Sequence, residues 1–130
     1  MIAAILESGE LERVSTGLSL LVSAAADGRP ALGLASYGAL GVLLDDDLEA
    51  RALAPDAAPH VAAEGRKAFA RTLAELRDTA LALEEVRIWA CAAAVETTGA
   101  DRALVEARLE GVLSTPRFLR EVAGAELVVL

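Results

Sequence analysis

Short aliphatic runs alternate along the chain with longer segments whose apolar residues recur every three or four positions. The runs are apolar throughout rather than at every second position, which is typical of parallel strands that are covered on both faces. Four runs are clear and a fifth is weaker. The clear runs are residues 2–6, 31–35 (with an extension to Leu44 left open), 86–90 and 126–130, and the weaker run is 109–113.

The first long segment has the period of an amphipathic helix from Leu11 to Ala25. Ser8 is expected to cap this helix, and Gly28 lies just past its end. A second helix is expected over residues 69–83, with a charged face that includes Arg77 and points to water.

Two further helices are indicated near the end of the chain. A good helix-forming segment, Ala-Ala-Ala-Val-Glu, follows Cys91 directly. Thr115 and Pro116 are expected to be the N-cap and first residue of a short last helix that ends near Gly124. Residues 45–65 are the least regular part and predict a long, partly helical excursion over the surface.

Strands that alternate with helices predict βαβ units. The expected fold is therefore a three-layer α/β/α sandwich with a mainly parallel five-stranded sheet. The length of 130 residues predicts a single domain over residues 1–130.

Composition disfavours several classes of partner. The net charge of -8 and an aromatic content of 3% disfavour nucleic acid and anionic membranes, because both require clustered basic residues. No apolar run reaches the roughly 20 residues that span a bilayer, and the apolar start lacks the basic flank of a signal peptide. One cysteine excludes an intramolecular disulfide and a multi-cysteine zinc site, so a reducing cytoplasm is the expected compartment.

The candidate site residues lie directly after the predicted strands. Ligands of open parallel sheets bind outside the carboxyl ends of the strands. Ser8-Gly9-Glu10 follows the first run, Ser36-Tyr37-Gly38 follows the second, and Cys91 follows the third. Five of these residues are the expected site, with Cys91 as the catalytic residue and Ser8, Gly9, Tyr37 and Gly38 as the wall of a substrate pocket.

Cys91 is the most informative of the five. A thiol at the start of a helix meets unpaired N–H groups and the positive end of the helix dipole, which favour the nucleophilic thiolate. The alternative is a small buried side chain, since free cysteines are often buried. A Cys–His dyad would require His60 to come from the excursion, where a lone histidine is more often solvated.

Other signals for a site are weak. The Asp45–Asp46–Asp47 run could attract a cation but lacks the spacing of a calcium loop, so a solvated acidic loop is the expectation. The Ser8–Gly9 turn could bind an anion but lacks a full nucleotide-binding motif. The chain has no GxSxG, HExxH or CxxC motif.

Segments in order along nearly the whole chain resemble the DsrE/DsrF-like sulfur-relay family. Val-Arg-Ile-Trp-Ala-Cys at 86–91 is similar to the strand and cysteine of that family, "VkIwAC", and is the most specific match. The further matching segments are Ser-Gly-Glu-Leu-Glu-Arg at 8–13, Ala-Ala-Ala-Asp-Gly at 24–28, Ser-Tyr-Gly-Ala-Leu-Gly-Val-Leu-Leu at 36–44, Gly99, Gly111-Val112 and Ala-Glu-Leu-Val at 125–128.

The resemblance implies a five-stranded α/β fold that assembles as a trimer or hexamer, with sulfur donor and acceptor proteins as partners. It implies that Cys91 carries sulfur as a persulfide. This chemistry requires no metal, no cofactor and no second cysteine.

Three functions remain open from the sequence. The first is the persulfide carrier or sulfurtransferase, the second is a non-catalytic oligomeric binding or scaffold protein of the same fold, and the third is a small-ligand or nucleotide-binding protein. A mean hydropathy of +0.44 independently favours a homo-oligomer, because it indicates more apolar area than one small domain can bury.

Overall fold

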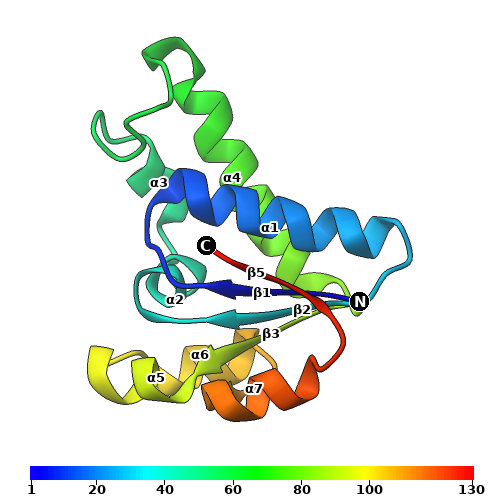
Figure 1. Cartoon of the computed structure of the whole chain (residues 1–130). Coiled ribbons are helices and arrows are strands. Elements are labelled where there is room, and N and C mark those ends of the chain that lie inside the picture. Colours follow the sequence, from blue (N-terminus) through cyan, green and yellow to red (C-terminus); the bar gives the residue numbers. More distant parts are fainter.

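The computed structural model describes all 130 residues, and all five predicted runs contribute strands to one sheet (Figure 1). Every neighbouring pair is parallel, and the strand order is β4-β3-β2-β1-β5. The chain adds β2, β3 and β4 on one side of β1 and then returns to place β5 on the other side. The strands are β1 (Ile2–Leu6), β2 (Ala31–Ala35), β3 (Val86–Cys91), β4 (Val112–Leu113) and β5 (Glu126–Val129).

Helices cover both faces of this sheet, so the predicted three-layer α/β/α sandwich is confirmed. Figure 1 shows α1, α3 and α4 on one face and α5, α6 and α7 on the other. One cluster of 34 buried residues runs through the layers. The helices are α1 (Leu11–Ala26), α2 (Tyr37–Leu43), α3 (Leu48–Ala52), a 3₁₀ turn η1 (Ala63–Gly65), α4 (Arg66–Ala82), α5 (Ala92–Thr98), α6 (Arg102–Arg108) and α7 (Thr115–Glu121).

The second strand does not extend to Leu44. It ends at Ala35, and residues 37–43 form α2 instead. Tyr37 has a φ of 41°, a conformation in which a strand cannot continue. The buried side chains that follow, Ala39, Leu40 and Leu43, fit one face of a helix.

The two edge strands are less covered than continuously apolar runs predict. Leu127 and Val129 of β5 are 46% and 61% exposed, and Val112 of the two-residue β4 is also exposed. The expectation of strands covered on both faces therefore holds for β1, β2 and β3 but was wrong for the edges. An apolar run has the same pattern in the centre and at the edge of a sheet, so the pattern cannot distinguish them.

The predicted caps are each displaced. The N-cap of α1 is Glu10 and not Ser8. The Ser8 hydroxyl instead accepts a hydrogen bond of 3.1 Å from the Glu10 N–H in the turn before the helix. Ser114, not Thr115, caps α7, and its side chain accepts from the Arg117 N–H. Caps depend on the exact residue at which a helix starts, which hydrophobic periodicity does not define.

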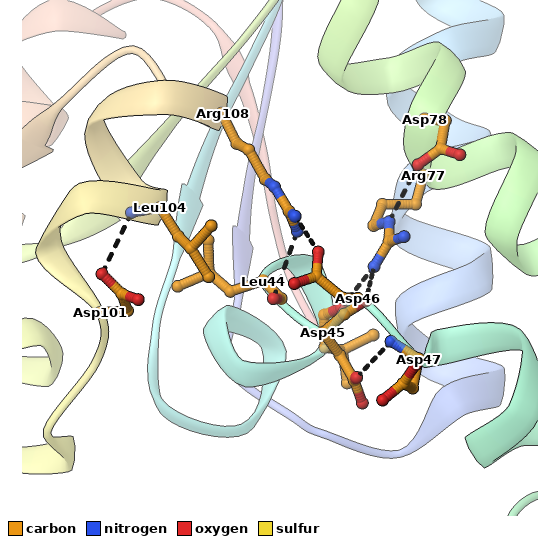
Figure 2. A network of polar contacts seen from close by, with 10 residues as sticks. Leu44, Asp45, Asp46, Asp47, Arg77, Asp78, Asp101, Leu104 and Arg108 are labelled. Atoms are coloured by element: carbon orange, nitrogen blue, oxygen red, sulfur yellow. Dashed lines mark hydrogen bonds and ion pairs between the residues drawn. The ribbon is translucent and has the colours of Figure 1, made fainter.

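Arg77 of α4 was expected to face water, but it is one of two buried polar or charged residues and is only 7% exposed. Its guanidinium donates to the backbone oxygens of Val42 (3.3 Å) and Asp45, and its Nε donates to Asp78 (Figure 2). Arg77 thereby supplies donors to carbonyls at and just after the C-terminal end of α2, and the Val42 oxygen also accepts from the Asp45 N–H at 3.3 Å.

Arginines pair with two carboxylates of the acidic run at residues 45–47, while Asp46 and Asp47 remain exposed, as expected for a solvated loop. Arg108 of α6 pairs with Asp46 and donates to the Leu44 oxygen at 3.2 Å, and Arg51 pairs with Asp45 at 3.4 Å. Figure 2 shows Arg77 and Arg108 reaching this turn from opposite sides. No three potential metal-binding side chains come together anywhere in the chain. None of its helices is long and apolar enough for a membrane span.

Candidate functional site

Cys91 is the last residue of β3 and lies between two neighbouring strands at their carboxyl ends. On one side it pairs in register with Leu113 of β4. On the other side Ala90 pairs with Ala35, so the next residue of that chain segment, Ser36, lies opposite Cys91. Parallel pairing therefore places the thiol between the residues that follow β2 and β4.

Helix α7 brings a second hydroxyl to this point. Phe118 of α7 is fully buried and meets Trp89 of β3 edge to face, with ring centroids 6.3 Å apart and planes at 67°. This contact holds the start of α7 against the end of β3. The first residue of the helix, Thr115, thereby comes to the thiol of Cys91.

The thiol is buried, with Cys91 only 5% exposed. Burial raises the pKa of Cys91, because it penalises the charged thiolate. Four donors oppose this effect, in the order Ala94 N–H, Ser36 hydroxyl, Ala93 N–H and Thr115 hydroxyl, and together they lower the pKa below its ordinary value. The site thus stabilises a thiolate at a place that water hardly reaches.

The sequence places Ser36 in a turn at the same sheet edge as Cys91 but does not select its hydroxyl for the site, and it assigns Thr115 only as a helix cap. Ser36 is buried at the end of β2, and Thr115 is exposed at the start of α7. Each follows a strand that neighbours β3. A polar residue that follows a strand can be assigned to the surroundings of Cys91 only once the strand order is known.

Two of the four expected pocket residues line an open hollow. Ser8 and Tyr37 border a space of about 470 Å³ together with Arg13 and Val129. This hollow lies at the carboxyl ends of β1 and β5. Cys91 does not line it, because β2 separates the end of β3 from the end of β1.

The other two expected pocket residues, Gly9 and Gly38, hold two backbones together. A Cβ on Gly38 would lie 2.5 Å from the backbone nitrogen of Gly9, a distance that side-chain movement cannot relieve. Glycine at Gly38 therefore lets the start of α2 rest against the turn after β1.

His60 lies in the excursion and is exposed. Its backbone N–H donates to the Glu12 carboxylate at 3.0 Å, which ties the excursion to the first turn of α1. His60 is not among the groups that act on the thiol of Cys91, so the structure offers no Cys–His dyad.

The site therefore combines a sheet edge of parallel strands with one ionisable thiol and hydroxyl donors on both sides. No model of a known protein family matches the sequence, and a comparison with curated proteins finds no match. The class that the fold and the site define is an α/β sandwich with a single buried thiol at the carboxyl edge of its sheet.

Proposed function

We propose that this protein is a persulfide carrier, a sulfurtransferase that acts through Cys91. The observation that carries the proposal is the buried thiol whose pKa is lowered, against its burial, by Ala94, Ser36, Ala93 and Thr115. A thiolate is the nucleophile in sulfur exchange. The resemblance of residues 86–91 to the strand and cysteine of DsrE/DsrF-like proteins supports the same function.

The reaction balances without an oxidant or a metal. The Cys91 thiolate attacks the outer sulfur of a donor persulfide, the donor S–S bond breaks, and the donor leaves as a thiolate. An acceptor thiolate then attacks the outer sulfur on Cys91, which returns as a thiolate. A shielded site suits this carrier, because it keeps the persulfide away from water and from small oxidants.

Sulfur donor and acceptor proteins are the proposed partners, together with further copies of the chain. Exposed Leu127 and Val129 on the edge strand β5 support self-association, since an open apolar edge can pair with another chain. We propose a homo-oligomer, a trimer or hexamer on the resemblance.

The test compares the native protein with Cys91→Ser. Both are incubated with a small-molecule persulfide, desalted and weighed intact by mass spectrometry. We expect the native chain alone to gain the mass of whole sulfur atoms, and to lose it when an acceptor thiol is added. An unmodified native chain, or equal gain in Cys91→Ser, would refute the carrier.

A second candidate is a small-ligand or nucleotide-binding protein, favoured by the hollow that Ser8 and Tyr37 border. A third is a non-catalytic scaffold, favoured by the burial of Cys91. Ligand-induced chemical shift changes confined to Ser8 and Tyr37 would support the second. The third predicts neither these changes nor sulfur on Cys91.

A further inference from the structure

Ser36 has an unusual place for a small polar residue. It is 6% exposed, and only Arg77 shares with it the combination of a polar side chain and burial. Ser36 lies opposite Cys91 on the neighbouring strand, because the preceding residues Ala35 and Ala90 pair in register. A buried hydroxyl needs a hydrogen-bond partner.

The hydroxyl of Ser36 does not make the helix-capping hydrogen bond that its position predicts. Ser36 is the N-cap of α2, where serine side chains commonly accept from an N–H of the first turn. The side chain makes no such bond here. The strand register places Ser36 beside Cys91 instead, and its hydroxyl there lowers the pKa of the thiol.

The backbone directly after Ser36 is held in a costly conformation. Tyr37 is the only non-glycine residue with a positive φ, at 41°. Its side chain is 47% exposed, so little side-chain burial offsets the strain. The contact of Gly38 with Gly9 keeps the next residue in place.

The far end of α2 is fixed as well. Arg77 donates to the oxygens of Val42 and Asp45, and Arg108 donates to the oxygen of Leu44 (Figure 2). Helix α2 is therefore anchored at both ends, by the glycine contact at its start and by the two arginines at its end. Ser36 has little freedom to leave the sulfur.

We propose that Ser36 is the positioning residue of Cys91, held against the sulfur by the strained turn at Tyr37 and by the anchored helix α2. The role in sulfur transfer rests on the proposed function. The hydroxyl donates to the Cys91 sulfur when that atom bears the negative charge, before it attacks the donor. It donates again when the acceptor attacks the outer sulfur and Cys91 departs as the thiolate.

The test uses the rate of alkylation of Cys91 by iodoacetamide as a function of pH, since the chain has no other thiol. In Ser36→Ala the midpoint of the rate profile is expected about one pH unit higher, with about tenfold slower alkylation below the native midpoint. Ser36→Thr keeps the hydroxyl and is expected to restore the native midpoint. Ser19→Ala, the same change to alanine on the exposed side of α1, is the matched control.

Tyr37→Gly tests the contact without touching the hydroxyl. Glycine adopts a positive φ without strain, so the variant is expected to unfold at no lower urea concentration than the native chain. Its alkylation midpoint is nevertheless expected to rise, because Ser36 is then held less firmly. A higher alkylation midpoint without a loss of stability would show that the turn at Tyr37 positions Ser36 and does not only support the fold. This test of Tyr37→Gly is available even if Ser36→Ala does not fold.

A native midpoint in Ser36→Ala, or in Tyr37→Gly, would overturn the inference, as would a Ser36→Thr midpoint as high as that of Ser36→Ala. Alkylation requires no sulfur donor. A chain that takes up no persulfide but shows the expected alkylation profiles would therefore refute the proposed function and leave the role of Ser36 on the thiol intact.

Discussion

At the residue scale, the ionisation of Cys91 is decided by two opposed effects. Burial favours the neutral thiol, and donors from three chain segments favour the thiolate. The donors come from Ser36 after β2, from Ala93 and Ala94 at the start of α5, and from Thr115 after β4. A cysteine buried as a simple apolar residue would lack them and would have a raised pKa.

The lowered pKa makes the stability of the fold depend on pH. Between the lowered pKa of the folded chain and the ordinary pKa of the unfolded chain, the thiol of Cys91 is ionised only in the folded state. Unfolding then takes up a proton, so the free energy of unfolding rises with pH across this window. The contribution is complete above the ordinary thiol pKa and is lost as the pH falls through the folded value.

Urea denaturation of the native chain and of Cys91→Ala over a pH series checks this expectation. The difference in the free energy of unfolding between the two is expected to shift in favour of the native chain as the pH rises. Parallel curves for the two proteins over the whole series would contradict a lowered pKa.

Two glycines of α2 give opposite expectations for the same substitution. Gly38→Ala places a Cβ 2.5 Å from the Gly9 nitrogen and is expected to destabilise the fold by about 1–3 kcal/mol. Gly41→Ala meets nothing within 4 Å and is expected to stabilise by about 0.5–1 kcal/mol, because alanine is the better helix former. Urea denaturation measures both, and equal effects at the two positions would contradict the close backbone contact.

At the element scale, the place of the short helix α2 depends on contacts with other elements. Its seven residues are too few to be stable alone. Its start lies against the turn after β1, and its end accepts hydrogen bonds from α4 and α6. The loop after β2 can therefore present Ser36 in one geometry.

Removing one anchor of α2 tests this account. Arg77→Met removes the guanidinium donor from the oxygens of Val42 and Asp45, of which Val42 keeps the Asp45 N–H, and is expected to destabilise the fold by about 1–3 kcal/mol. Arg71→Met, an exposed position on the same helix, is expected to change stability by less than about 0.5 kcal/mol. Denaturant midpoints of the two variants are compared, and an Arg77→Met variant as stable as Arg71→Met would show that Arg77 is not an anchor of α2.

At the scale of the whole molecule, the open edge strand β5 exposes two apolar side chains, Leu127 and Val129. Strand β5 has no lysine or proline to discourage pairing, and its single charge, Glu126, is paired with Arg29 at 3.1 Å. Leu127 and Val129 lie on one face of that strand. This surface agrees with the high mean hydropathy of the chain.

Val129→Lys is expected to reduce or abolish the proposed self-association, because it places a charge on the open strand. Leu53→Lys, at another exposed apolar position, is expected to leave it unchanged. Size-exclusion chromatography with light scattering at micromolar concentration gives the masses. A monomeric native chain, or equal dissociation of both variants, would refute an oligomer formed through β5.

Much of the architecture is determined by the sequence alone. The runs at 2–6 and 31–35 are strands with the predicted bounds, and Cys91 ends the third strand as the pattern indicates to within one residue. The helical periods at 11–25 and 69–83 are correct to within a few residues. These features follow from local hydrophobic periodicity, which each segment carries by itself.

The tertiary structure decided everything that depends on which segments become neighbours. Strand order and register bring Ser36 and Thr115 to Cys91, although about 55 and 24 residues of chain separate them from it. The same long-range pairing buries Arg77 and leaves Val129 exposed. Hydrophobic periodicity indicates which face of one segment is buried but not which residues lie opposite that face. The sequence therefore pointed to Cys91 as the candidate residue, while only the fold determined which groups surround it.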